Sequence, residues 1–222
     1  SKVGITSENE LGYGGDIPVL KNFEAAANLN PDTLVIGSAS QGGFISDEYR
    51  IEVIKAIEAG CDIIVEKPFA TTLDSFNRIK TAICTHQSRF LISFQRRFHP
   101  LITELNAFIE QKQCGDILSI SIDVSSYVPA WHPYEDYRKG YSAKEELGGG
   151  IAMTMTHELD FLRWFFGEIK EIFSITKKVS ELEITADDIS TMTMIFKNNI
   201  IGELHLDYFA RPQFKSCKIK ST

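Results

Sequence analysis

Two short groups of residues combine side chains suited to acid–base chemistry, and the first is Glu66-Lys67-Pro68, which directly follows an apolar run. A lysine at the end of a buried strand can donate to a hydroxyl or ribose oxygen, and the neighbouring Glu66 can hold it in place. Pro68 fixes its own φ and so aims the preceding pair. The alternative interpretation is a solvated ion pair at a strand end.

The second group is His157 with Asp160, downstream of Gly148, Gly149 and Gly150. A spacing of three residues places both side chains on one face of a helix. Histidine is the usual proton acceptor for an alcohol that is being oxidised, so His157 is a candidate base. The alternative is a partly buried histidine satisfied by Asp160. The three glycines let the backbone approach another chain or a ligand closely, or they form a flexible hinge.

Two further segments carry side chains suited to binding. In residues 95–100 (Gln-Arg-Arg-Phe-His-Pro), Arg97 can pair with a phosphate or a carboxylate. The alternative there is a solvated corner between a strand and a helix. In residues 131–138, aromatic rings alternate with polar groups, which suits stacking on a sugar ring or a nicotinamide. A surface loop with scattered aromatic residues is the alternative for this segment.

The familiar glycine-rich phosphate motifs are absent from the sequence. Residues 12–17 carry the first two glycines of a Gly-x-Gly-x-x-Gly pattern, but Ile17 stands at the third position and Pro18 follows. This stretch therefore predicts a loop rather than a dinucleotide cradle. Neither a Walker A segment nor a Gly-x-Ser-x-Gly nucleophile elbow is present.

The elements that must position these groups change character near residue 93. Before it, strands at 32–38, 62–66 and 90–94 alternate with helices at 47–59 and 72–84, which is typical of parallel crossover units. After it come helices at 100–109 and from the glycines to Phe166, then strands at 117–124, 169–177, 188–196 and 200–208. The sequence predicts a partial Rossmann-like α/β domain over 1–93 and an α+β domain with a large antiparallel sheet over 94–222.

Composition excludes several classes of protein and partner. The 222 residues are 43% hydrophobic and 24% charged, which is ordinary for a globular chain. A formal charge of −7 repels phosphate backbones and anionic lipid, so neither nucleic acid nor a membrane is an expected partner. No signal peptide is evident, and the cysteines at 61, 84, 114 and 217 form no metal or disulfide spacing. A cytoplasmic location, free thiols and no metal site are expected.

The order of these segments resembles the glucose–fructose oxidoreductase and inositol dehydrogenase family (Gfo/Idh/MocA). Residues 56–68 resemble the second half of its Rossmann domain, where a Glu-Lys-Pro triplet ends the fifth strand. Residues 95–100 resemble the segment after the sixth strand, and Tyr137-Arg138 with the glycines resembles the Trp-Arg…Gly-Gly stretch. Residues 157–167 are similar to the family's His-x-x-Asp…Trp-Leu-x-Gly helix.

The resemblance implies an oxidoreductase that uses NAD or NADP and moves hydride between nicotinamide and a secondary alcohol of a sugar, cyclitol or nucleotide-sugar. Lys67 would stabilise the alkoxide-like oxygen and His157 would accept the proton. The expected cofactor contacts are Gly37, Ser38, Ala39, Glu66, Lys67, Pro68, Gln95 and Arg138. The expected substrate contacts are Arg97, Trp131, Tyr137 and Asp160. The open face of the antiparallel sheet is expected to pack against another subunit, which predicts a homo-oligomer.

The departures from the family pattern leave a second hypothesis open. The first Rossmann strand with its glycine motif is not legible, and the last sheet is expected to stop after Tyr208, so the chain resembles a member that is incomplete at both ends. Met153 stands where inositol dehydrogenase-like members carry an aspartate, so His157 is expected to be a mostly neutral base without that carboxylate. The alternative is a non-catalytic sugar-binding or assembly module that retains the fold but has lost the cofactor site.

Overall fold

The computed structural model describes residues 4–5, 19–20, 22–37, 47–70 and 72–222. These residues form two compact units, of which unit 1 ends at Ser93 and unit 2 begins at Phe94. No helix among the described residues is long and apolar enough to cross a bilayer.

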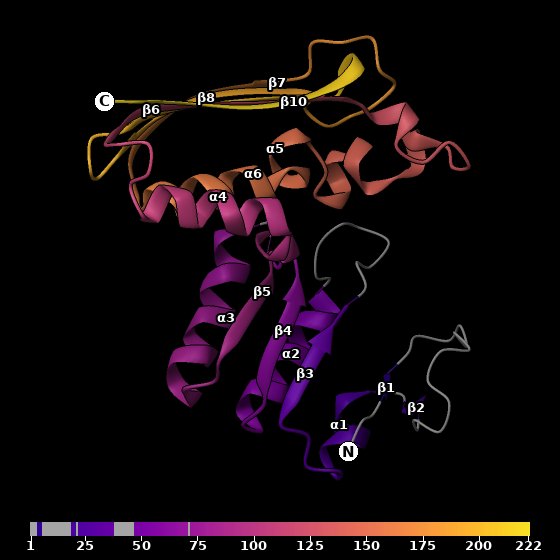
Figure 1. Cartoon of the computed structure of the whole chain (residues 1–222). Helices are drawn as coiled ribbons and strands as arrows, with labels where there is room; N and C mark the ends of the chain where they lie inside the picture. Colours follow the sequence, from indigo (N-terminus) through magenta and orange to yellow (C-terminus); the bar gives the residue numbers. More distant parts are fainter. Residues whose placement is uncertain (1–3, 6–18, 21, 38–46, 71) are drawn as a thin grey trace. The chain divides into compact units, whose positions relative to one another are not determined.

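Unit 1 is built on a three-stranded parallel sheet in the order β3-β4-β5 (Figure 1). Its strands are β3 (Thr33–Ile36), β4 (Asp62–Glu66) and β5 (Phe90–Ser93), and its helices are α1 (Phe23–Ala27), α2 (Asp47–Glu58) and α3 (Leu73–His86). A separate parallel pair joins β1 (Gly4–Ile5) to β2 (Val19–Leu20). The predicted alternation of parallel strands and helices is confirmed over these residues.

Local sequence explains the main elements of unit 1. Ile63 and Val65 of β4 are buried against α2, whose Ile57 is fully buried as well, so one face of each element faces the same core. The Thr72 side chain accepts a hydrogen bond from the backbone N–H of residue 75 at 3.2 Å and so caps the start of α3. Gly60 adopts a φ of 86°, which ends the turn after α2 at little steric cost.

Unit 2 is built on a five-stranded sheet in the order β10-β6-β9-β8-β7. Its strands are β6 (Ile117–Tyr127), β7 (Ile169–Lys177), β8 (Ile189–Phe196), β9 (Ile201–Asp207) and β10 (Phe209–Ser221). The predicted antiparallel sheet is confirmed in three of its four pairings and is wrong for β6 and β9, which run parallel. Pairing between strands so far apart along the chain depends on tertiary packing, which the order of elements does not reveal.

The expectation that this sheet stops after Tyr208 is also wrong. β10 follows that residue and pairs antiparallel with β6 along most of its length. Its sequence contains Pro212 and three lysines and is exposed at most positions. These are features of an edge strand, and they hide the apolar alternation by which the other strands are recognised.

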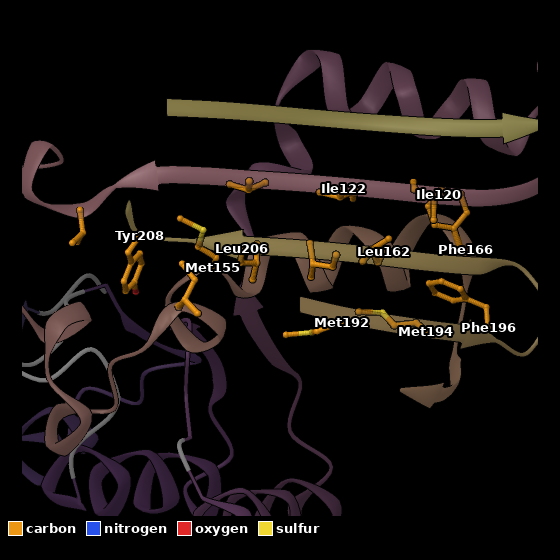
Figure 2. Close-up of a cluster of buried hydrophobic side chains, with 14 of the residues drawn as sticks. Ile120, Ile122, Met155, Leu162, Phe166, Met192, Met194, Phe196, Leu206 and Tyr208 are labelled. Carbon is orange, nitrogen blue, oxygen red and sulfur yellow. The ribbon is translucent and has the colours of Figure 1, made fainter. Parts of the chain in front are cut away.

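The core of unit 2 lies between the sheet and the helices α4 (Pro100–Glu110), α5 (Ile151–Thr154) and α6 (Thr156–Phe166), which cover one face (Figure 1). Alternate residues of the three central strands point into it and meet Leu162 and Phe166 of α6 (Figure 2). The labelled strand residues of this cluster are Ile120, Ile122, Met192, Met194, Phe196 and Leu206. Residues between them, such as Thr191 and Thr193, face the open side of the sheet and are exposed.

The predicted single helix from the glycines to Phe166 is interrupted. Met155 has φ −99° and ψ 38°, and it separates α5 from α6. Neither proline nor glycine occurs at this point, so no local signal marks the break. Met155 is buried in the core beside Ile151 and Leu162, and tertiary packing rather than local sequence explains the interruption.

Short 3₁₀ turns fill the remaining connections of unit 2. They are η1 (Gln95–Phe98), η2 (Val128–Ala130), η3 (Tyr137–Lys139), η4 (Tyr141–Ala143) and η5 (Glu145–Leu147). The predicted hairpin at residues 197–199 is confirmed, with Asn199 at a φ of 67° between β8 and β9.

Candidate functional site

In unit 1 the candidate residues lie at the carboxyl ends of parallel strands. The register aligns Ile36 of β3 with Val65 of β4, and Glu66 with Ser93 of β5, so the three strands end at one edge. Lys67 and Pro68 follow at that edge, half-buried and joined by a cis peptide bond. Ligands of open α/β sheets bind outside this kind of edge, which makes Lys67 a well-placed hydrogen-bond donor for a ligand oxygen.

A glycine follows the end of β3 at this edge. Gly37 follows the strand, and no described atom lies within 4 Å of the position that a Cβ would occupy there. Together with residues 66–68, Gly37 lies at the kind of edge where parallel sheets hold dinucleotides. Ser38 and Ala39, the other expected contacts at this end, lie outside the described residues, as does the loop at 12–17.

In unit 2, helix α6 carries the candidate base inside the protein. His157 is only 3% exposed, and its ring packs edge-to-face with the ring of Phe94 at a centroid distance of 5.8 Å. Glu158 and Asp160, on the same helix, are also buried. The imidazole therefore sits in a packed environment that limits its motion.

Arg97 is paired with a carboxylate of its own chain. Its Nε and Nη2 donate to the two carboxylate oxygens of Asp160 at 2.7 Å and 2.5 Å. Its guanidinium also lies 5.1 Å from the centre of the Trp164 ring. The bond to Asp160 raises the pKa of Arg97. The structure thus brings together two of the expected substrate residues, Arg97 and Asp160, as a bidentate ion pair.

The neighbouring ion pair was not predicted. Arg96 Nη1 donates to Glu158 Oε1 at 2.9 Å, and the Glu158 side chain is 5% exposed. The sequence shows two adjacent arginines in one segment and, in another, two acids spaced by two residues. Only the fold, which places η1 against α6, identifies them as partners.

The Trp131 side chain packs against other residues of unit 2. Its Nε1 donates to Ser126 Oγ at 3.1 Å, and its ring lies edge-on to buried Tyr208 at 5.3 Å. The Tyr137 hydroxyl accepts from the backbone N–H of residue 183 at 3.3 Å. Both aromatic residues pack against the core, so they hold the 131–138 segment in place.

Arg138 is engaged by two carboxylates of its own unit. It binds Asp136 through Nε at 2.8 Å and Glu183 through Nη1 at 2.8 Å, and these bonds hold its pKa above the usual range. Gln95, the other expected cofactor contact in unit 2, is exposed in η1.

The glycines before α5 allow close packing within the chain. A Cβ at Gly149 would lie 2.1 Å from the carbonyl oxygen of Tyr141, and a Cβ at Gly150 would lie 2.5 Å from Asp187 Oδ1. Gly150 also has a φ of 113°. The predicted approach to another molecule is therefore wrong at these two glycines, because the chain itself fills this space. The alternative of a hinge stays a prediction.

Asp187 is a further polar residue that sequence reasoning missed. Its Oδ2 accepts from the backbone N–H of Ile151 at 2.9 Å, which fixes the start of α5. Burial raises the pKa of this carboxyl. All four cysteines are free thiols in the structure. No group of His, Cys, Asp or Glu among the described residues could hold a metal ion.

Two family models match the chain. Residues 102–222 match the GFO/IDH/MocA C-terminal domain, and residues 1–89 match a Rossmann-like domain of unknown function, DUF1611_N.

Curated relatives include dehydrogenases of cyclitols. Inositol 2-dehydrogenase of Gluconacetobacter diazotrophicus is 32% identical over 135 residues, which cover 60% of this chain and 35% of that protein. An inositol 2-dehydrogenase/D-chiro-inositol 3-dehydrogenase of Shouchella clausii is 29% identical over 54% of this chain and 32% of its own length. The matched segment thus spans about a third of these relatives.

Solved structures share the fold across nearly the whole chain. The WlbA dehydrogenase of Bordetella pertussis, in complex with NADH and UDP-GlcNAcA, has a TM-score of 0.75 at 21% identity and covers 93% of this chain and 61% of its own. Apo scyllo-inositol dehydrogenase of Lactobacillus casei has a TM-score of 0.74 at 18% identity, covering 100% and 64%. The domain match, which extends over more than half of the sequence, establishes that the chain belongs to the GFO/IDH/MocA family.

Proposed function

We propose that the chain is part of an NAD(P)-dependent oxidoreductase that moves hydride between nicotinamide and a secondary alcohol of a sugar, cyclitol or nucleotide-sugar. The observation that carries this proposal is the position of Glu66-Lys67-Pro68 at the shared carboxyl edge of β3, β4 and β5. Relatives named as inositol dehydrogenases, a levoglucosan dehydrogenase, and a solved complex with UDP-GlcNAcA support a cyclic polyol as the substrate class.

The residues of the chain divide the work in this proposal. Bound nicotinamide would accept or donate the hydride. Lys67 donates a hydrogen bond to the reacting oxygen and stabilises negative charge as that oxygen becomes alkoxide-like. His157 accepts the hydroxyl proton during oxidation and returns it during reduction.

Further residues of each unit are proposed to contact the cofactor or the substrate. Gly37, Ser38, Ala39, Glu66, Pro68, Gln95 and Arg138 are the proposed cofactor contacts. Trp131 and Tyr137 are proposed to line the substrate. Asp160 is buried and bound to Arg97, so its proposed contribution is to hold that guanidinium.

The direct test is Lys67→Ala in the protein that binds nicotinamide. Loss of a donor to a developing oxyanion is expected to lower kcat about 100-fold or more. The thermal midpoint should be unchanged, because the side chain is half-buried at a strand end. Lys80→Ala on α3, whose exposed side chain lies over Phe76, is the matched control and should retain full activity. Full turnover by Lys67→Ala would show that the assignment is wrong.

A non-catalytic sugar-binding or assembly module is the second candidate. Met153 supports it, because a thioether cannot replace the carboxylate expected near the base, and so does the absence of a complete glycine motif. Nicotinamide fluorescence titration of this chain and of a version extended upstream separates the two. Binding by either form supports the enzyme, and binding by neither supports the module.

We also propose that the open face of the sheet in unit 2 joins two copies of the chain. Phe173, Ile175 and Ile201 are exposed large hydrophobic residues, and their strand partners face the open side. Sedimentation at micromolar concentration should show a dimer or larger species. Phe173→Lys should weaken it, and a strict monomer in the unmodified chain would contradict the interface.

A further inference from the structure

Two ion pairs fasten η1 to helix α6 within unit 2. Arg97 makes two parallel bonds to Asp160, and Arg96 makes one to Glu158. The two carboxylates are 7% and 5% exposed, whereas the arginine side chains are 37% and 45% exposed. Removing the partner of a buried carboxylate leaves an uncompensated charge and destabilises the fold. Each of these acids therefore holds one arginine in place.

The same segment also contacts the candidate base. The ring of Phe94, which directly precedes η1, packs edge-to-face with the His157 ring at an interplanar angle of 77°. The Arg97 guanidinium lies 5.7 Å from the centre of the Phe94 ring and 5.1 Å from that of Trp164, on α6. Arg97 therefore touches both the ring that packs on the imidazole and the helix that carries it.

We propose that Arg96 and Arg97 are positioning residues that hold Phe94 and α6 together and thereby fix the orientation of the His157 imidazole. This inference rests on the proposed function, in which His157 accepts the proton. It differs from the expectation that Arg97 binds an anionic group of the substrate. Two guanidinium nitrogens of Arg97 already donate to Asp160, so its planar fork is matched to a carboxylate within the chain.

Nuclear magnetic resonance of labelled histidine and phenylalanine tests the positioning directly. In the unmodified chain the Phe94 and His157 rings should give a nuclear Overhauser contact. Arg97→Gln should weaken that contact and shift the His157 signal, but it leaves Asp160 buried without a cation and can unfold the unit. Arg97→Gln with Asp160→Asn removes both charges together, so this double variant should stay folded and still lose the contact.

Arg163→Gln is the matched control for this measurement. Arg163 lies on the same helix and makes an ion pair with Glu168 in which both side chains are more than half exposed. Its loss should leave the His157 signal unchanged. Arg97→Lys keeps the charge but not the two parallel bonds, so it should recover only part of the ring contact.

Kinetics of the nicotinamide-binding protein supply the second measurement. A misplaced base should lower kcat about 10- to 100-fold, with KM changed less than about twofold. A rise in KM with normal kcat and an unchanged His157 signal would identify Arg97 as a substrate ligand and overturn the proposal. An unchanged ring contact in the folded double variant would overturn it as well. If the unmodified protein shows no turnover, only the proposed function is contradicted. The nuclear magnetic resonance measurement still tests whether Arg97 positions the His157 ring.

Discussion

The candidate residues of the two units lie in different surroundings. In unit 1, Glu66 and Lys67 are half-buried at a strand end, while other residues of the sheet and helices make the core. In unit 2, His157 and Asp160 are buried on α6 and held by the segment that begins at Phe94. The candidate residues of unit 1 can therefore be replaced with little effect on folding, whereas those of unit 2 contribute to the packing that stabilises the unit.

The largest expected effect contrasts two glycines. Gly149→Ala in unit 2 places a Cβ against the carbonyl oxygens of Tyr141 and Lys144, at 2.1 Å and 2.6 Å. Because both are backbone atoms, the cost should be about 3 kcal/mol in the free energy of unfolding. Gly37→Ala in unit 1 should change it by less than about 0.5 kcal/mol. Urea titrations measure both, and equal effects would break the comparison.

The next contrast concerns two acids. Asp160→Asn keeps the shape of the side chain but removes the charge that faces Arg97, which should cost about 2 kcal/mol. Glu66→Gln at the strand end should stay within about 0.5 kcal/mol. Thermal and urea denaturation of both variants check this expectation. A larger loss in Glu66→Gln would mean that the strand end of unit 1 also depends on its charge.

A third contrast concerns pH, because the pKa values of two aspartates shift in opposite directions. Arg89 holds the pKa of Asp62 in unit 1 below its usual range, so that stabilisation is present at neutral pH and is lost as pH falls through the lowered pKa. Burial raises the pKa of Asp187 in unit 2, so its stabilisation is present in acid and is lost as pH rises through the raised pKa.

Urea midpoints followed between about pH 2.5 and pH 7, around the ordinary aspartate pKa of about 3.9, test both signs. Asp62→Asn should reduce the loss of stability in acid, and Asp187→Asn should reduce the loss toward neutral pH. The same direction of change in both variants would contradict the assignment.

The smallest expected effect is that of Arg138→Gln. The Arg138 guanidinium and the Glu183 carboxylate are both exposed, so water replaces the lost bonds and the urea midpoint should stay within error. If Arg138 contacts the cofactor as proposed, the affinity for nicotinamide should nevertheless fall several-fold, which fluorescence titration measures. A midpoint shift as large as that of Asp160→Asn would instead assign Arg138 a packing role.

Local patterns predicted most of the elements. The strand at Asp62–Glu66 follows from its short β-branched run, the start of α3 from the Thr72 cap, and the strand at Ile169–Lys177 from its alternation. The parallel pairing of β6 with β9 and the break at Met155 could not be predicted, because both depend on contacts between distant segments. β10 was missed because an exposed edge strand lacks an apolar alternation.

The candidate site was predictable in its residue types and not in its partners. Lys67 was expected at a strand end because the preceding run reads as a buried strand, and the structure has it there. Residue type alone assigned Arg97 to a carboxylate or phosphate, but only the fold supplies Asp160 as that carboxylate. From the sequence alone, the Trp131 ring could stack on a ligand or pack within the chain. The structure shows that it packs against Tyr208.

The central place of β6 has a consequence for the order in which unit 2 can assemble. Its two neighbours, β9 and β10, both come late in the chain, after α5, α6, β7 and β8. During synthesis, β6 therefore exposes both of its hydrogen-bonding edges until Ile201 and the residues beyond it have emerged. Such delayed pairing slows folding and leaves an unpaired strand open to other chains. Loss of the last strands should thus produce aggregation during expression rather than a smaller folded unit.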